Sequence, residues 1–184
     1  LKRLELLFKQ ETSPLDTAAI ILETVLGEGG YVPAPTAFLE GVRAICDKHG
    51  ILLIVDEIQA GFGRTGKMFA IEHSGVRPDL MTFAKGFANG YPISCLVGNK
   101  GVMDVMSPGT LGGTYAGNAV ACAAARATIE TFQNERVLEN VAERSKQLFS
   151  GLDAIRQTSF GKVIEDIRGM GLMVGVQFAS GPGE

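Results

Sequence analysis

The sequence has few of the residues that build metal centres or disulfide frameworks. Its two histidines, His49 and His73, are too few and too isolated for a zinc site. Its three cysteines form no C-x-x-C pair, and their odd number argues against a disulfide framework and suits a reducing compartment. We therefore expect all five of these side chains to be structural.

Long apolar runs and runs of one charge are also missing. No apolar stretch approaches the roughly 18 residues that a membrane helix needs. The formal net charge is -3 and no lysine or arginine run forms a stripe, so we expect no nucleic-acid partner and no membrane partner. The chain begins with Leu1 inside an amphipathic pattern and stops just after an apparent strand. This predicts an internal piece of a larger protein.

The sequence does contain short apolar runs that alternate with helical patterns. Continuous apolar runs predict four buried strands, at residues 18–25, 51–58, 79–84 and 93–98. Helical spacing predicts helices at residues 35–50, 116–133 and 135–155, the first of them ended by Gly50. The apolar face of that first helix consists of Phe38, Leu39, Val42, Ile45 and Cys46. Because short apolar strands alternate with helices, we predict an α/β fold with a mostly parallel sheet covered on both faces.

The C-terminal part of the sequence is different in character. Residues 162–178 predict two short strands around Gly169 and Gly171. Together with the helix at residues 135–155, this strand pair suggests the start of a second domain.

Two acidic residues, Asp56 and Glu57, end the strand predicted at residues 51–58. Ligands of α/β sheets bind at such carboxyl ends. Residues 61–67 then match the G-x-x-x-x-G-K pattern of a phosphate loop, which suggests an ATPase. However, Met68 stands where a phosphate loop needs serine or threonine, and no strand directly precedes the match. We therefore prefer another role for Asp56 and keep the ATPase as an alternative.

Lys85 follows the strand predicted at residues 79–84, at the same edge of the sheet as Asp56. A desolvated lysine is a nucleophile that can form a Schiff base. Pyridoxal phosphate (PLP) requires such a lysine and an acidic partner for its pyridinium nitrogen. It also requires a phosphate site, and the glycine loop before the helix at residues 116–133 offers Thr110 or Thr114.

Three motifs resemble those of class-III PLP-dependent aminotransferases, the family of the 4-aminobutyrate, ornithine and acetylornithine aminotransferases. They are "ETVLGEGG" (23–30), "ILLIVDEIQAGFGRTGKMFAIEHSGVRPDLMTFAKG" (51–86) and "GGTYAGN" (112–118). The resemblance spans nearly the whole chain and implies fold type I. By this resemblance, residues 1–133 are part of the PLP-binding large domain. Residues 134–184 are a linking helix and the incomplete start of an α+β C-terminal small domain.

The resemblance also implies roles for four residues that bind the cofactor PLP. Lys85 would form the Schiff base and act in catalysis together with Asp56, which would pair with the pyridinium nitrogen. Gln59 would hydrogen-bond the phenolic oxygen of the ring. Thr114 would bind the cofactor phosphate of the neighbouring subunit, so a homodimer with a shared active site is implied.

Two glutamates are implied to face the substrate. Glu28 matches a glutamate that pairs with a carboxylate-binding arginine and swings aside between half-reactions, and Glu23 would lie near the site. The implied reaction is a ping-pong transfer of an amino group to a 2-oxo acid. Its donor would be an amine or an ω-amino acid that is 4-aminobutyrate-like or ornithine-like. An aminomutase, a racemase, a decarboxylase and a non-catalytic scaffold are alternatives. We expect a cytoplasmic protein, or one of the mitochondrial matrix if a transit peptide preceded the chain.

The sequence departs from the family pattern at three positions. Thr24 and Leu26 stand where proline and glutamine are usual, and Ala119 stands where proline is common. These changes spare the ionisable groups but bear on the substrate pocket. The first phosphate loop, the aromatic residue that stacks on the ring and the carboxylate-binding arginine would lie outside the chain. We therefore expect these 184 residues alone to be an inefficient enzyme.

Each assigned residue also has a purely structural alternative. Asp56 and Glu57 would then cap the turn that follows them, and Gln59 would be an ordinary loop residue. Thr114 would be a helix N-cap, and Glu28 an exposed loop carboxylate.

Overall fold

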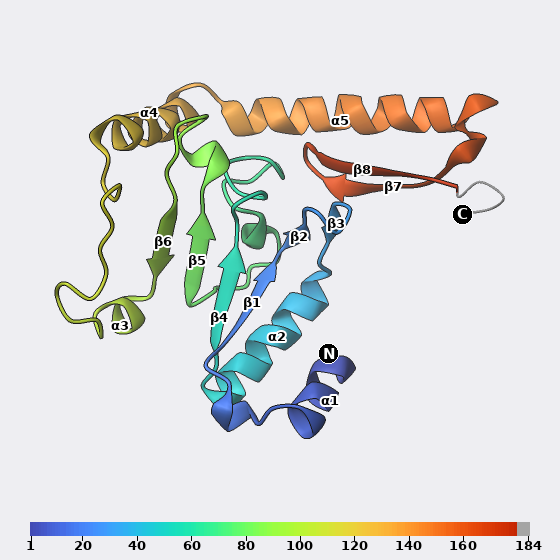
Figure 1. Cartoon of the computed structure of the whole chain (residues 1–184). Coiled ribbons are helices and arrows are strands. Elements are labelled where there is room, and N and C mark those ends of the chain that lie inside the picture. Colours follow the sequence, from blue (N-terminus) through green and yellow to red (C-terminus); the bar gives the residue numbers. More distant parts are fainter. Residues whose placement is uncertain (180–184) are drawn as a thin grey trace.

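The computed structural model describes residues 1–179, and Figure 1 shows their arrangement. The α-helices are α1 (Lys2–Gln10), α2 (Thr36–His49), α3 (Lys100–Met103), α4 (Ala119–Asn134) and α5 (Val137–Arg156). Short 3-10 helices are η1 (Pro14–Asp16), η2 (Ala70–His73), η3 (Lys85–Phe87) and η4 (Phe160–Val163). The strands are β1 (Ala19–Glu23), β2 (Val25–Leu26), β3 (Val32–Pro33), β4 (Leu52–Asp56), β5 (Leu80–Phe83), β6 (Cys95–Gly98), β7 (Ile164–Met170) and β8 (Met173–Phe178).

Four strands form the central sheet in the order β1-β4-β5-β6. β1, β4 and β5 are parallel, and β6 runs antiparallel to β5. All four predicted strands are present, each somewhat shorter than the apolar run that predicted it. The prediction of an α/β fold with a mostly parallel sheet is therefore confirmed.

The apolar run at residues 18–25 is not one strand, because the chain turns at Thr24. The Thr24 hydroxyl donates a hydrogen bond to Glu57 Oε1 over 3.3 Å, and the Ala34 N–H donates to the Thr24 carbonyl oxygen over 2.9 Å. Beyond the turn, β2 pairs with β3 as a short antiparallel ladder. These bonds end β1 at Glu23 and start the loop that carries Glu28.

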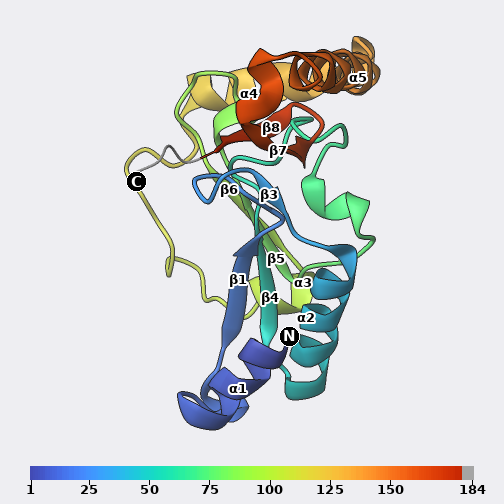
Figure 2. The same cartoon turned by 90° about the vertical axis from the view of Figure 1, so that its right-hand side faces the viewer.

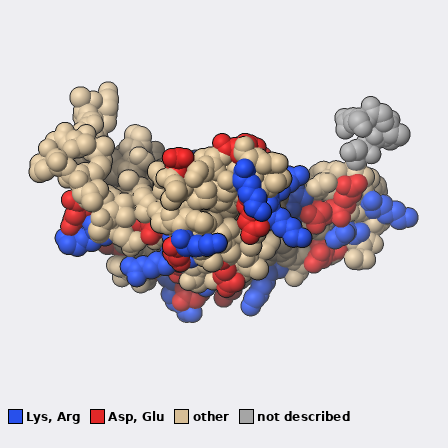
Figure 3. Space-filling model, turned by 90° about the horizontal axis from the view of Figure 1, so that it is seen from below, with Lys and Arg blue, Asp and Glu red and all other residues tan. Residues whose placement is uncertain are grey.

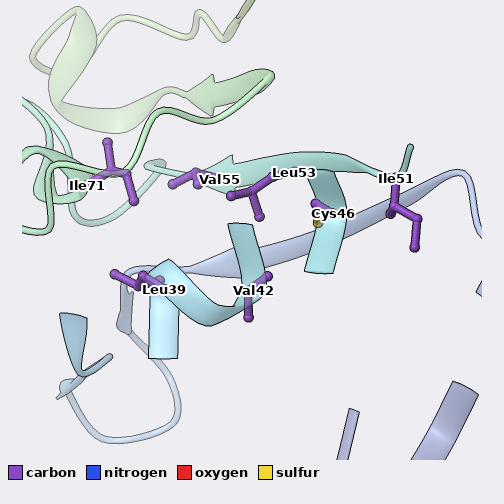
Figure 4. Close-up of a cluster of buried hydrophobic side chains, with 7 residues drawn as sticks. All are labelled: Leu39, Val42, Cys46, Ile51, Leu53, Val55 and Ile71. Carbon is purple, nitrogen blue, oxygen red and sulfur yellow. The ribbon is translucent and has the colours of Figure 1, made fainter. Parts of the chain in front are cut away.

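The main hydrophobic core lies between α2 and one face of the sheet (Figure 4). Its buried members are Leu39, Val42, Cys46, Ile51, Leu53, Val55 and Ile71. Along β4, buried Leu53 and Val55 alternate with half-buried Leu52 and Ile54, because successive side chains of a strand point to opposite faces. Gly50 ends α2 in the left-handed conformation, with φ 68°, at the predicted position.

The opposite face of the sheet is less covered than predicted. Figure 2 shows α2 on one side of the sheet, and among residues 1–179 it is the helix that packs along β4. On the other face, Ile21 of β1 is 61% exposed and Leu96 of β6 is 43% exposed. Within residues 1–179, this second face is therefore covered less than the face on which α2 packs.

Helices α4 and α5 and the hairpin β7-β8 form the C-terminal part, with α5 running along the hairpin (Figure 1). The hairpin is a two-stranded sheet separate from the central one. Both predicted helices are present, but α4 begins at Ala119 rather than at residue 116. Its start is fixed by Asn118, whose side chain accepts hydrogen bonds from the N–H groups of Val120 and Ala121. The two strands predicted within residues 162–178 are confirmed.

On the face of the molecule seen from below, charged side chains of both signs lie among one another (Figure 3). Within residues 1–179, no helix has both the length and the apolar character needed to cross a bilayer. The same part of the chain contains no group of three or more His, Cys, Asp or Glu side chains placed to hold a metal ion.

Candidate active site

The ends of the three parallel strands bring several polar side chains to one edge of the sheet. Glu23, the last residue of β1, pairs in register with Asp56, the last residue of β4. Asp56 in turn pairs with Thr82 of β5, and Lys85 follows that strand after one intervening residue. This edge is the upper one in Figure 1. It is the edge at which α/β sheets hold their ligands.

Asp56 combines a structural bond with an unused oxygen. Its Oδ1 accepts a hydrogen bond from the Ile58 N–H over 2.8 Å, which fixes the turn that follows β4. This is the capping role that the structural alternative predicts. Within residues 1–179, Oδ2 accepts no hydrogen bond, so the half-buried carboxylate retains an acceptor for a ligand.

Lys85 has an unusual backbone and an exposed side chain. Its φ is 44°, in the left-handed region that non-glycine residues seldom adopt. The residue lines a cavity of about 440 Å³ together with Gln59, Tyr31 and Arg64. Leu172 and Met173, from the β7-β8 hairpin, line the same cavity. The lysine therefore borders a hollow of a size that suits a small molecule.

Gln59 and the loop after β1 meet above the end of β4. Gln59 Nε2 donates to Glu28 Oε1 over 3.4 Å, which is long for a hydrogen bond. The side chain also packs so closely on Gly27 that a β-carbon there would collide with it. The Gly27 N–H donates to Glu23 Oε2 over 2.9 Å, and Glu23 and Asp56 line a second hollow, of about 700 Å³.

Thr114 is not brought together with the other five predicted residues. It is exposed and lies in the connection between α3 and α4, which Figure 1 shows beside β6. The structural alternative for Thr114, a helix N-cap, is wrong. α4 begins five residues later, and Asn118 caps it.

Glu57 is a residue whose importance the sequence reasoning missed. Its side chain is fully buried, with 0% exposure. It accepts hydrogen bonds from the Ala70 N–H at 2.9 Å, the Ile71 N–H at 2.8 Å and the Thr24 hydroxyl at 3.3 Å. Burial raises the pKa of Glu57, and the bonds from Ala70 and Ile71 act in the opposite direction. A charged residue next to a buried strand is the signal that could have revealed this anchor, because such groups are buried only when paired.

The phosphate-loop alternative does not fit the structure. Residues 61–67 form turns, and Lys67 Nζ donates to the Glu72 carbonyl oxygen over 3.0 Å. The element that follows is η2, a four-residue 3-10 helix, rather than the long helix whose N-terminus would hold phosphates. The turn instead carries the chain from the end of β4 past the lysine cavity.

The model of one protein family matches this chain over nearly its whole length. The description of that family is aminotransferase class-III, and the match covers residues 1–183. The chain belongs to the class-III aminotransferases. The resemblance of the three sequence motifs is therefore confirmed.

Curated relatives are similar over most of this class-III chain. The 5-aminovalerate aminotransferase DavT of Pseudomonas putida is 50% identical over 173 residues, which cover 94% of this chain and 40% of that protein. The 4-aminobutyrate aminotransferase GabT of Escherichia coli is 46% identical over 171 residues, 93% of this chain and 40% of that protein. The chain thus spans about two-fifths of the length of these relatives.

A solved structure shows the same fold. The taurine:2-oxoglutarate aminotransferase of Bifidobacterium kashiwanohense, determined in complex with PLP and glutamate, is 38% identical. The superposition has a TM-score of 0.89 and covers 96% of this chain and 40% of the chain in that structure. The predicted fold-type I class is therefore confirmed.

Proposed function

We propose that the full-length protein is a PLP-dependent aminotransferase and that Lys85, Asp56 and Gln59 hold the cofactor. The observation that carries this proposal is the placement of all three residues at the carboxyl edge of the sheet in a class-III chain. When bound, PLP withdraws electrons from the carbon that carries the amino group.

The side chains present fit this cofactor. Asp56 Oδ2 has no hydrogen-bond donor within residues 1–179, so it can pair with a protonated ring nitrogen. The amide of Gln59 is held by a single long bond to Glu28, so it can turn to the ring oxygen. Lys85 supplies an amine at the cavity for covalent attachment. Asp56 and Gln59 are thus each fixed by one hydrogen bond and still have polar atoms free to bind the cofactor.

Asp56 and Lys85 have different roles in the proposed reaction. Asp56 would pair with the ring nitrogen of the bound cofactor and favour its protonated form. Lys85 is the titratable amine of the cavity and moves a proton to and from the reacting carbon of the substrate, first as a base and then as an acid. Leu172 and Met173 cover part of the cavity and limit the access of water.

The amino donor is proposed to be an ω-amino acid. The named donors of two relatives, 5-aminovalerate and 4-aminobutyrate, carry an amine at one end and a carboxylate at the other. Glu28 lies in the loop over the site, where it can pair with a cation that binds a substrate carboxylate. Replacing Glu28 by alanine should impair one half-reaction more than the other. Equal losses in both half-reactions would remove this argument.

Transfer of nitrogen is the direct test of the reaction type. The full-length protein is incubated with ¹⁵N-labelled 5-aminovalerate or 4-aminobutyrate and with unlabelled 2-oxoglutarate, and the glutamate formed is analysed by mass spectrometry. We expect ¹⁵N-glutamate from the wild type and from Lys67→Ala, but none from Lys85→Ala. A product made without nitrogen transfer would indicate an aminomutase, a racemase or a decarboxylase. ATP binding that Lys67→Ala abolishes would support the phosphate-loop alternative.

The domain division and the homodimer are part of the same proposal. The separate sheet β7-β8, preceded by the long helix α5, supports a small domain that starts within residues 134–184. The exposed position of Thr114 is consistent with a role in a neighbouring subunit. Sedimentation of the wild type and of Thr114→Ala, with cofactor content measured in parallel, tests this role. Unchanged cofactor affinity in a dimeric Thr114→Ala variant would argue against it.

A further inference from the structure

A cluster of five phenylalanines lies directly behind the Lys85 segment. Phe62 is its centre, with ring centroids 5.6 Å from Phe69, 5.5 Å from Phe83, 5.2 Å from Phe87 and 6.3 Å from Phe132. Phe62 and Phe83 are buried, with 8% and 7% exposure. Aromatic pairs at such distances add about 0.5–1.5 kcal/mol each beyond their buried area. The five rings therefore form one closely packed group.

Two phenylalanines of the cluster flank Lys85 in the sequence. Phe83 and Phe87 stand two residues before and two residues after the lysine, and their rings meet edge to face at 4.9 Å. Both rings also contact Phe62. The Lys85 backbone is thus part of a short loop whose two ends are held together by three packed rings.

The close packing of this loop depends on glycine. A β-carbon at Gly86 would come within 3.2 Å of Phe62 Cβ, so the segment after Lys85 rests directly on Phe62. A β-carbon at Gly61 would come within 2.7 Å of the Glu57 carbonyl oxygen, and one at Gly63 within 2.8 Å of the Phe132 ring. The glycines on both sides of Phe62 therefore let the chain bring that ring against the lysine segment.

The backbone of Lys85, which the phenylalanine cluster packs against, is strained. A residue with a side chain costs of order 1 kcal/mol or more in the left-handed region and stays there only when its surroundings enforce it. Phe62 is itself left-handed, with φ 52°. We propose that Phe62 is a positioning residue, which holds Lys85 in its left-handed conformation and so aims the amine at the cofactor cavity. This inference rests on the proposed function of Lys85.

The test compares Phe62→Leu with a matched control, Phe132→Leu, in the full-length protein. Among the described rings, Phe132 pairs with Phe62 and with no other member of the cluster, so it shares the packing but does not flank the lysine. Phe62→Met is a milder variant, because the flexible, unbranched methionine side chain can adapt to an irregular gap without a ring. It keeps the test possible if Phe62→Leu does not fold.

The first readout needs no cofactor. Hydrogen exchange of the Phe87 amide, which donates to the Ala84 carbonyl oxygen over 2.9 Å, reports on the turn around Lys85. In the cofactor-free protein we expect this amide to exchange about tenfold faster or more in both Phe62 variants, and within about twofold of wild type in Phe132→Leu. Wild-type exchange in the Phe62 variants, or an equal effect of Phe132→Leu, would overturn the inference.

The second readout separates positioning from the function of the lysine itself. We expect PLP to attach to Lys85 about tenfold more slowly in the Phe62 variants, and the pH dependence of that attachment to shift, with Phe132→Leu like the wild type. A purely structural role would lower thermal stability and leave the attachment rate and its pH profile unchanged, which would contradict the proposal. If the wild type takes up no PLP while the exchange result holds, the proposed function fails and the aromatic support of the Lys85 backbone stands.

Discussion

Replacing Glu57 by alanine should loosen the loop that follows β4 far more than replacing a neighbouring surface glutamate. Glu57 is fully buried and accepts the N–H groups of Ala70 and Ile71 and the hydroxyl of Thr24. It thereby joins three separate segments: the end of β4, the turn after β1 and the start of η2.

The size of the effect follows from the bonds that are lost. A buried N–H without an acceptor costs about 1–3 kcal/mol, so the two backbone groups together cost about 2–6 kcal/mol. Removal of the carboxylate also relieves its desolvation, which burial imposes and which raises the pKa of Glu57. We therefore expect a net loss of about 3 kcal/mol in the local free energy of opening. This corresponds to about 100-fold faster exchange of the amides of Ala70 and Ile71.

Hydrogen exchange with mass spectrometry on the full-length protein is the assay, with Glu72→Ala as the matched control. Glu72 also accepts a backbone N–H, that of Phe69 at 2.7 Å, but this bond is exposed to solvent. Its loss should cost about 1 kcal/mol or less. If Glu57→Ala accelerates exchange no more than Glu72→Ala does, the reasoning about the buried anchor is refuted.

Two further predictions concern the core and the pH dependence of stability. Leu53 is 1% exposed and lies in the core, so Leu53→Ala should lower the free energy of unfolding by about 2–5 kcal/mol. Leu15 is 91% exposed, so Leu15→Ala should change the free energy of unfolding by less than about 0.5 kcal/mol. Urea denaturation of both variants checks this, and similar losses would contradict the core assignment. Burial raises the pKa of Asp79, but hydrogen bonds from the Leu53 N–H and Arg43 outweigh it, and the net pKa is lowered. A carboxylate whose pKa is lowered in the folded state stabilises the fold at pH values above its unfolded pKa of about 3.9. Wild type should therefore be more stable than Asp79→Asn at neutral pH. This advantage should be lost as the pH falls below about 4. Denaturation from pH 7 to pH 3 measures it, and a constant advantage would contradict the assignment.

Elements whose signal is local were predictable from the sequence. The helix at residues 35–50 showed an apolar face, and Leu39, Val42 and Cys46 of that face are buried in the core. Phe38, assigned to the same face, is 37% exposed because it lies at the rim of the second hollow. Periodicity identifies the face of a helix, but the depth of each residue depends on elements elsewhere in the chain.

Features that arise from distant contacts were not predictable. The run at residues 18–25 reads as one strand, and the bond that helps to end it at Thr24 comes from Glu57, 33 residues away. The start of α4, by contrast, has a local signal: Asn118, an N-cap residue, stands directly before the helix, whereas the prediction began the helix at residue 116.

In the candidate site, too, some features were predictable from the sequence and others were not. The positions of Asp56 and Lys85 after adjacent strands follow from the apolar runs, and their proposed roles follow from the family resemblance. The left-handed backbone of Lys85 and its support by Phe62 could not be read from the sequence. They depend on rings that come from four separate elements or turns.

The most direct test of the central claim is to locate the covalent bond to the cofactor. The full-length protein is incubated with PLP, reduced with borohydride and mapped by peptide mass spectrometry. The account predicts a single pyridoxyl adduct, on Lys85. An unmodified protein, or an adduct on another lysine such as Lys67, would contradict it.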